Sequence, residues 1–285
     1  MDGTRIALAS SYGLPAREVE RAFERGLRSF FWGALRRGDF GGAVRRLARR
    51  HRDAMTIAIQ TFTRAPRLVR PSVELARLRL GVDTIDVLGL GFWNVPPPPA
   101  LVDAALRLKA RGVVKSLVVS CHARPTFDAL LRDDAFDGVM VRYNAAHTAA
   151  ENEIFPLAQA RGKRVLAYTA TRWGTLLRDG AAPPGEKAPR GADCYRFVLS
   201  HPAVSACLAG PKDAAELDGV LEAVARGPMR EDELAWMRRV GAHVRAASKV
   251  PAPPRPGATW EHVRGIAREL WERGVTEGLI SRFNK

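Results

Sequence analysis

Cysteines, acidic residues and long apolar runs are all scarce in this chain, and each scarcity excludes a class of protein. The 285 residues include only Cys121, Cys194 and Cys207, and this odd, widely spaced set disfavours a disulfide framework and a zinc site. No run of 18 apolar residues occurs, and the N-terminus lacks a basic segment followed by an apolar one. We therefore expect no membrane span, no metal centre and a cytoplasmic location.

The shortage of acidic residues leaves a strongly basic chain. Asp and Glu number 30 against 45 Lys and Arg, so the net charge is +15. A polyanion partner would fit this charge, but the arginines are spread over helical segments without interleaved aromatic residues, which favours a solvated surface. Only residues 45–52, RRLARRHR, form a dense local patch for a phosphate or an acidic partner. We expect a small-molecule substrate, no specific nucleic-acid or membrane partner, and a monomer or weak dimer.

Strand-like and helical patterns alternate along most of the chain. An apolar content of 46% is ample for a core. Alternation in units of this kind predicts parallel strands joined by helices, and eight units predict a (β/α)8 barrel. No G-x-G-x-x-G follows the first strand, which disfavours a doubly wound open sheet. The strand-like runs are residues 5–10, 29–32, 56–60, 84–90, 116–120, 138–142, 164–169 and 204–210.

The remaining segments are expected as additions to this barrel. Residues 1–227 would form the barrel, and 228–285 a helical extension packed on it within the same domain. Residues 178–192 are a long Gly/Pro/charge-rich loop that could fold over the barrel mouth. The extension would consist of a helix over 230–249, a stiff proline linker over 250–257 and a second helix over 259–283.

The stretch Gly138 to Glu151, GVMVRYNAAHTAAE, carries an apolar strand into a polar cluster. Alternation of side chains places Arg142 and Asn144 on the face of Met140. If the following segment is helical, His147 and Glu151 stand one turn apart. A purely structural pairing of Arg142 with Glu151 is the competing interpretation.

Residues at the ends of the strands are the candidates for chemistry, because active sites of such barrels lie there. His122 is the first candidate for a general acid or base and His147 the second, since imidazole exchanges protons near neutrality. Tyr12 could be a relocated proton donor, and Arg142 and Arg172 could grip a carboxylate or phosphate. Gly89 and Gly91 lack side chains and would leave room for a ligand. The expected substrate-binding residues are Trp32, Arg36, Gln60, Trp93, Asn94, Asn144 and Arg172.

The order of several motifs resembles the aldo-keto reductase family over roughly residues 5–224. The segments are LARLRLGVDTIDVLGL, ALRLKARGVVKSLVVSCH, RVLAYTATRWGTLL and YRFVLSHPAVSACLAGPKDAAEL. The resemblance implies a (β/α)8 barrel that reduces carbonyl compounds with NADP(H) and an Asp, Tyr, Lys and His tetrad. It places Phe31, Gln60 and Gly91 at the Asp, Lys and His positions, and the Tyr position near Arg36. The resemblance therefore implies a divergent member that lacks the tetrad.

The residues that the resemblance assigns to the cofactor are only partly kept. Ser120 and Tyr168 match the Ser and the nicotinamide-stacking aromatic of the family, whereas Cys121 and Met140 replace its Asn and Gln. Thr169, Gly210 and Lys212 complete the expected cofactor-binding set.

Three functions stay open at this point. The favoured hypothesis is non-redox acid-base chemistry, such as a cyclisation, dehydration or isomerisation of a small anionic substrate, with no cofactor required. The alternative is an atypical NADP(H)-dependent oxidoreductase with a relocated proton donor. The third is a ligand-binding barrel without catalysis.

Overall fold

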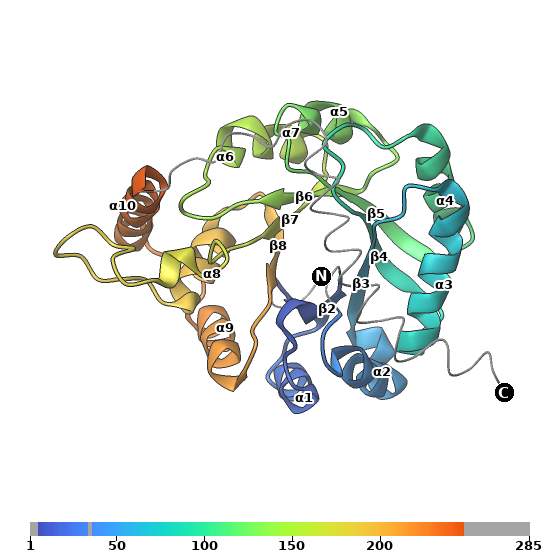
Figure 1. Cartoon of the computed structure of the whole chain (residues 1–285), viewed down its shortest axis with the longest axis horizontal. Coiled ribbons are helices and arrows are strands. Elements are labelled where there is room, and N and C mark those ends of the chain that lie inside the picture. The colour runs from blue at the N-terminus through green and yellow to red at the C-terminus, as the bar shows by residue number, and fades with distance from the viewer. Residues whose placement is uncertain (1–4, 34–35, 248–285) are drawn as a thin grey trace. The chain divides into compact units, whose positions relative to one another are not determined.

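Eight parallel strands form a closed barrel in the computed structural model, which describes residues 5–33 and 36–247. Each strand pairs with the next along the chain, and β1 pairs with β8 (Figure 1). The predicted (β/α)8 barrel is confirmed. The strands are β1 Ile6–Ala9, β2 Ser29–Trp32, β3 Thr56–Thr61, β4 Ile85–Leu90, β5 Val114–Ser120, β6 Gly138–Arg142, β7 Arg164–Tyr168 and β8 Val204–Ala209.

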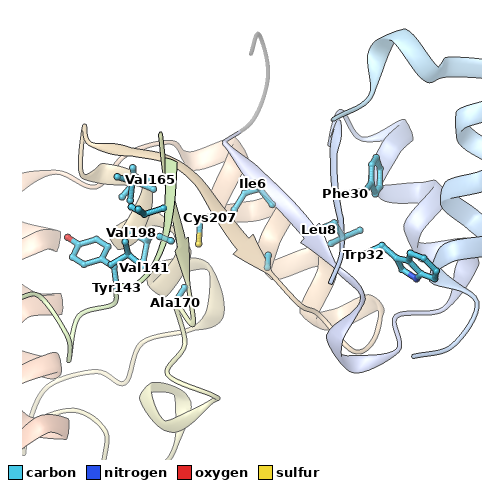
Figure 2. Close-up of a cluster of buried hydrophobic side chains, with 14 of the residues drawn as sticks. Ile6, Leu8, Phe30, Trp32, Val141, Tyr143, Val165, Ala170, Val198 and Cys207 are labelled. Atoms are coloured by element: carbon cyan, nitrogen blue, oxygen red, sulfur yellow. The ribbon is translucent and has the colours of Figure 1, made fainter. Parts of the chain in front are cut away.

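Helices surround the barrel because the strand side chains alternate between two apolar layers. One face of the strands fills the barrel interior with a cluster that includes Phe31, Val118 and Met140. The other face packs against the helices, and Figure 2 shows part of that layer around Leu8 and Phe30. The helices are α1 Ala16–Glu24, α2 Phe40–His51, α3 Val69–Leu80, α4 Pro99–Ala110, α5 Thr126–Arg132, α6 Ala150–Glu153, α7 Phe155–Ala160, α8 Gly191–Ser200, α9 Ala214–Arg226 and α10 Glu231–Ala247.

Short 3-10 turns occur between these elements: η1 Ser10–Tyr12, η2 Arg52–Ala54, η3 Pro66–Leu68 and η4 Thr175–Leu177. The helical segment after β6 is broken into α6 and α7 around Ile154. Pro156 explains the break, because proline has no N–H to donate into a preceding turn and its ring clashes with that turn.

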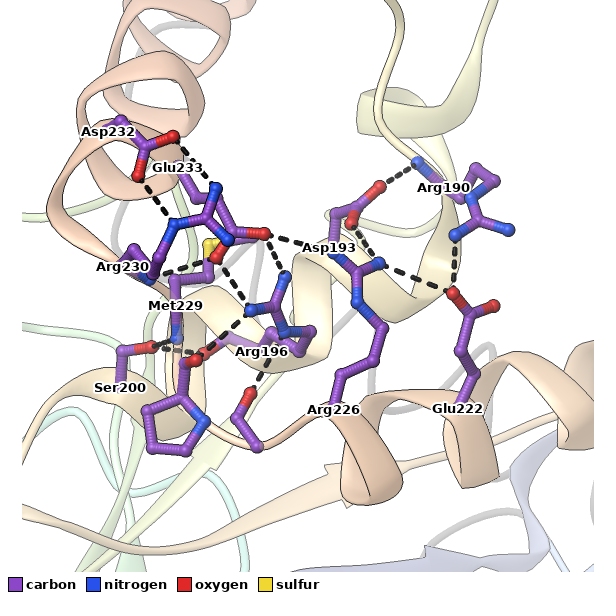
Figure 3. A network of polar contacts seen from close by, with 12 residues as sticks. Arg190, Asp193, Arg196, Ser200, Glu222, Arg226, Met229, Arg230, Asp232 and Glu233 are labelled. Atoms are coloured by element: carbon purple, nitrogen blue, oxygen red, sulfur yellow. Dashed lines mark hydrogen bonds and ion pairs between the residues drawn. The ribbon is translucent and has the colours of Figure 1, made fainter.

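A network of ion pairs joins α8, α9 and α10 (Figure 3). Arg196 is 3% exposed and binds both carboxylate oxygens of Glu233, at 2.6 and 2.7 Å. Arg226 of α9 bridges Glu233 and Asp193, at 3.0 and 3.2 Å. These contacts fix the start of α10 against the barrel.

The chain divides into two compact units, Met1–Arg245 and Ala246–Lys285, and nearly all of α10 belongs to the first. The loop expected as a lid is attached to α10. Glu186 pairs with Arg239 at 2.8 Å, and Trp236 Nε1 donates to the carbonyl of Lys187 at 3.2 Å. The linker predicted over 250–257 and the helix predicted over 259–283 lie outside the described residues.

Candidate active site

Buried polar atoms without hydrogen-bond partners gather at one end of the barrel. Five such side-chain atoms occur among the described residues, and four of them belong to residues within three positions of the carboxyl end of a strand. Buried polar groups are almost always hydrogen-bonded, so each exception requires an explanation. The four atoms are Gln60 Nε2, Trp93 Nε1, Ser120 Oγ and Thr169 Oγ1, and the fifth, Arg77 Nε, lies in α3.

Backbone strain occurs at the same end. In the described part of the chain, the residues other than glycine with a positive φ are Phe92, Thr169, Arg172 and Trp173, with φ between 50° and 54°. They lie in the loops after β4 and β7. Left-handed backbone at bulky or branched residues is unfavourable, and it occurs preferentially at functional sites. Unpaired polar atoms and strained backbone thus mark the carboxyl end of the barrel, the mouth, as the candidate active site.

A row of rings crosses this mouth. The centroids of Phe62 and Phe92 are 5.2 Å apart, those of Phe92 and His122 5.2 Å, and those of His122 and Tyr168 5.7 Å. The predicted candidates His122 and Tyr168 are therefore brought together. Phe62 and Phe92 were not expected at the site. Both lie in loops just after a strand, where side chains no longer alternate regularly and the sequence does not indicate which way they point.

Tyr168 and His122 form a polar pair within this row. The Tyr168 hydroxyl lies 3.3 Å from Nδ1 of His122 and 3.3 Å from the carbonyl oxygen of Cys121. Burial raises the pKa of Tyr168 far above its ordinary value, so the phenol stays protonated. The backbone of His122 is held by Asn94, whose Oδ1 accepts from the N–H groups of His122 and Ala123 at 3.1 and 3.2 Å. Asn94 thus positions His122 through its main chain.

The space expected at Gly89 of β4 and at Gly91, which follows this strand, is filled. A Cβ on Gly91 would lie 2.4 Å from the Phe62 ring and 2.9 Å from Gln60 Nε2. A Cβ on Gly89 would lie 3.3 Å from Gln60 and 3.5 Å from the sulfur of Met140. The prediction that these glycines leave room for a ligand is therefore wrong. The side chains of Gln60, Phe62 and Met140 occupy that volume.

The polar cluster after β6 also differs from its prediction. Glu151 does not pair with Arg142; it accepts the Tyr143 hydroxyl at 2.6 Å and pairs with Arg238 at 3.0 Å. His147 is not one helical turn from Glu151, because it forms an antiparallel bridge with Asn144 before α6 begins. The chain turns there instead of entering a helix directly.

Asn144 and His147 stabilise this turn through hydrogen bonds. Asn144 is fully buried, and it donates to the carbonyl of Thr169 at 2.9 Å while its Oδ1 accepts from the N–H of Ala146. His147 Nδ1 lies 3.2 Å from the same Oδ1. Burial, followed by the charges of Arg142 and Arg172, lowers the pKa of His147 to about 4. His147 is therefore neutral at pH 7, and Asn144 joins the loops after β6 and β7.

Trp32 faces away from the barrel interior, and Arg36 stacks on it. Trp32 belongs to the layer between strands and helices (Figure 2). A Cβ on Gly41 of α2 would lie 3.0 Å from its indole nitrogen. The guanidinium of Arg36 covers the Trp32 ring at 3.9 Å, and burial lowers the pKa of Arg36 to about 10. Strand alternation accounts for this placement, since Phe31 takes the inward position on β2.

Trp93 is buried below Arg64, a residue that the sequence did not single out. The Arg64 guanidinium lies 3.8 Å over the Trp93 ring and donates to the carbonyls of Gly91 and Phe92 at 2.9 and 2.8 Å. Arg64 therefore supports the strained loop after β4.

The turn after β8 carries little free positive charge. Lys212 pairs with Glu216 at 3.0 Å, and the N-terminus of α9 is capped by Asp213, whose Oδ1 accepts from the N–H of Glu216. Tyr12 is 48% exposed and lies beside Gly210, where an added Cβ would be 3.0 Å from its ring. Tyr12 thus lines the rim between β1 and β8.

The described residues provide neither a metal-binding cluster nor a membrane-spanning helix. No group of three or more His, Cys, Asp or Glu side chains there could hold a metal ion. In the same part of the chain no helix combines the length and apolarity that crossing a membrane requires.

Comparison with known proteins identifies the fold as that of the aldo-keto reductases. The structure superposes on the holo form of an aldo-keto reductase from Bacillus halodurans with a TM-score of 0.71 and 17% identity, over 89% of this chain and 95% of that one. An aldo/keto reductase from Klebsiella pneumoniae in complex with NADP and acetate gives 0.67 and 20%, over 84% and 91%.

Similarity in sequence is more limited. The NADH-specific methylglyoxal reductase of Escherichia coli (strain K12) is 29% identical over 132 residues, which are 44% of this chain and 40% of that reductase. No family model matches the chain.

Proposed function

We propose that this protein is a nicotinamide-dependent oxidoreductase that reduces small carbonyl compounds. The observation that carries the proposal is the Tyr168–His122 pair at the mouth of an aldo-keto reductase fold. The comparisons favour this function over non-redox acid-base chemistry, because the similar proteins are reductases. They likewise give no support to an active site that needs no cofactor.

The mouth offers groups that fit a nicotinamide. Ser120 Oγ and Thr169 Oγ1 are buried and lack partners, and a carboxamide could supply both donors and acceptors to them. Tyr168 ends β7 and directly precedes Thr169. When bound, the cofactor would supply a hydride, which no side chain can provide.

His122 is proposed to give the proton that a reduced carbonyl oxygen requires. An unperturbed imidazole exchanges a proton near neutrality, whereas the raised pKa of Tyr168 makes the phenol a poor acid. The role of Tyr168 would be to orient the ring of His122 through the 3.3 Å contact. The resemblance places Phe31, Gln60 and Gly91 at the Asp, Lys and His positions of the aldo-keto reductase tetrad. The proposal therefore requires a proton donor at a different position from the family's Tyr.

NAD(H) fits the chain better than NADP(H). A 2′-phosphate needs free cationic or N–H groups, but the Lys212 ammonium is paired with Glu216 and Asp213 caps α9. The similar Escherichia coli protein is named for NADH specificity. The deficit of free positive charge at this turn is the reason for proposing NAD(H).

Titration with NADH and NADPH, followed by nucleotide fluorescence, tests the proposal directly. We expect saturable binding of NADH and weaker binding of NADPH. Oxidation of NADH should then be followed with small aldehydes and 2-oxo acids. Failure to bind either nucleotide at millimolar concentration would exclude this function and leave a ligand-binding barrel.

A further inference from the structure

The loop after β4, residues 91–94, is anchored to both neighbouring strands. On the β3 side, the N–H of Gly91 donates to the carbonyl of Thr61 at 2.9 Å. On the β5 side, the N–H of Trp93 donates to the carbonyl of Ser120 at 2.8 Å. Because β4 lies between β3 and β5 in the barrel, this loop links the carboxyl ends of those two strands.

Phe92 is the strained residue of this loop, with a φ of +54°. Left-handed backbone is costly for a bulky side chain and persists only where the surroundings hold it. Arg64, which follows β3, supplies that hold: its Nη1 and Nη2 donate to the carbonyls of Gly91 and Phe92 at 2.9 and 2.8 Å. These carbonyls belong to the two peptide groups on either side of Phe92. One planar guanidinium thus restrains both backbone dihedral angles of Phe92.

His122 is held by the same loop in two ways. The ring of Phe92 lies against its imidazole, with centroids 5.2 Å apart and planes 34° apart. Its main-chain N–H donates to Asn94 Oδ1 at 3.1 Å. The conformation of the loop depends in turn on Arg64, which also covers the Trp93 ring at 3.8 Å. A chain of measured contacts therefore leads from Arg64 to His122.

We propose that Arg64 is a positioning residue, which holds Phe92 in place and thereby orients the imidazole of His122 in the mouth. The consequence for catalysis rests on the proposed reductase function, in which His122 supplies the proton. A proton donor acts only from a defined position, and a displacement of about 1 Å can lower a rate by about 100-fold. Turnover thus depends on a guanidinium that bonds only the main chain of the neighbouring loop.

NMR of the imidazole rings in the full chain tests the positioning without nucleotide or turnover. Comparison with His122→Gln identifies the His122 signal in the wild type. Arg64→Gln should displace this signal, because the ring current of Phe92 acts on the imidazole and changes when the Phe92 ring moves. The amide of glutamine cannot reproduce a charged fork that bonds two carbonyls.

Arg28→Gln is the matched control. Arg28 also covers an aromatic ring, that of Phe23 at 4.2 Å, and also donates to two carbonyls, those of Phe23 and Leu27. It directly precedes β2, at the opposite end of the barrel. Arg28→Gln should therefore lower the Tm to a similar extent as Arg64→Gln and leave the His122 signal where it is in the wild type.

Steady-state kinetics then measure the consequence for the reaction. Arg64→Gln should lower kcat by about 10- to 100-fold and leave KM for NADH and for the carbonyl compound unchanged, because only the proton donor is displaced. Arg28→Gln should keep the wild-type kcat. Millimolar guanidinium chloride should restore part of the turnover of Arg64→Ala and should not raise that of Arg28→Ala.

An unmoved His122 signal in Arg64→Gln would overturn the proposal, as would an equal displacement in Arg28→Gln. A raised KM for the carbonyl compound at unchanged kcat would mean that Arg64 contacts the substrate, which also overturns it. If Arg64→Gln does not fold, the His122 signal and turnover of Arg64→Lys decide: wild-type values for both would show that the planar fork is not needed. A displaced His122 signal in a protein whose wild type binds no nucleotide would retain the positioning and sink the reductase function alone.

Discussion

The hydroxyl of Tyr168 lies 3.3 Å from the imidazole of His122, although 46 residues separate them in the chain. Their strands are not neighbours in the barrel, since β6 stands between β5 and β7. The contact exists because both residues are at strand ends, where the barrel brings its carboxyl edges together. A proton-exchanging group and a neutral phenol thereby meet beside two buried hydroxyls without partners.

Replacing His122 with Gln should lower carbonyl reduction by a factor of about 10² to 10⁴, because general acid catalysis contributes on that scale. NADH affinity should change little. Steady-state turnover and nucleotide fluorescence measure the two effects separately. His243→Gln on α10 is the matched control and should leave turnover at the wild-type rate. Equal turnover in His122→Gln and wild type would remove His122 from the mechanism.

Replacing Glu216 with Gln should raise NADPH affinity relative to NADH. The substitution frees the ammonium of Lys212, which is now paired at 3.0 Å. A gain of about tenfold, or about 1.4 kcal/mol, is expected for a charge-assisted contact to the phosphate. Paired titrations with both nucleotides give the ratio. Glu222→Gln on the same helix should not alter it, and a shift of equal size there would point to a general charge effect.

Replacing Gly241 with Ala should destabilise the protein by several kcal/mol, since overpacking against backbone cannot be relieved by a side-chain rotation. The added carbon would lie 2.0 Å from the Ala145 carbonyl oxygen. The same substitution at Gly219 of α9 meets nothing nearer than 3.9 Å and should stabilise by about 1 kcal/mol through helix propensity. Denaturant unfolding of both variants measures the contrast, and a neutral Gly241→Ala would contradict the close contact.

The Arg196–Glu233 pair should make stability depend on acid pH. Hydrogen bonds from Arg196 lower the pKa of Glu233 from 4.5 to about 2. The folded state therefore binds its proton less readily than the unfolded state does, and the pair stabilises fully above pH 4.5 and loses its effect as pH falls towards 2. Thermal unfolding over pH 2 to 7 should show this slope in the wild type and a smaller one in Glu233→Gln. Equal slopes would refute the linkage.

Replacing Arg196 with Met should cost about 3 kcal/mol, because it leaves a carboxylate without its buried partner. Arg230→Gln, which breaks an exposed pair with Asp232 at 3.0 Å, should cost less than about 1 kcal/mol. Denaturant unfolding compares the two, and equal losses would mean that burial of the Arg196 pair is unimportant.

The barrel could be predicted from the sequence because strand and helix periods alternate locally, and the ends of the strands then indicate where side chains meet. This reasoning brought Ser120, His122 and Tyr168 to one place. It failed for Gly89 and Gly91, because Gln60 and Phe62 reach that volume from the neighbouring strand. It also missed the contact of Gly241 on α10 with Ala145 in the loop after β6, because no local pattern encodes it. The turn at Asn144 and His147 escaped prediction because it depends on the carbonyl of Thr169, which belongs to another loop.

Because Gly241 lies so close to Ala145, helix α10 limits where the loop after β6 can lie. A helix that lies outside the barrel thus sets the position of the loop that carries His147. Substitutions on α10 that alter this contact would therefore move the loop after β6 while every residue of the barrel stays the same.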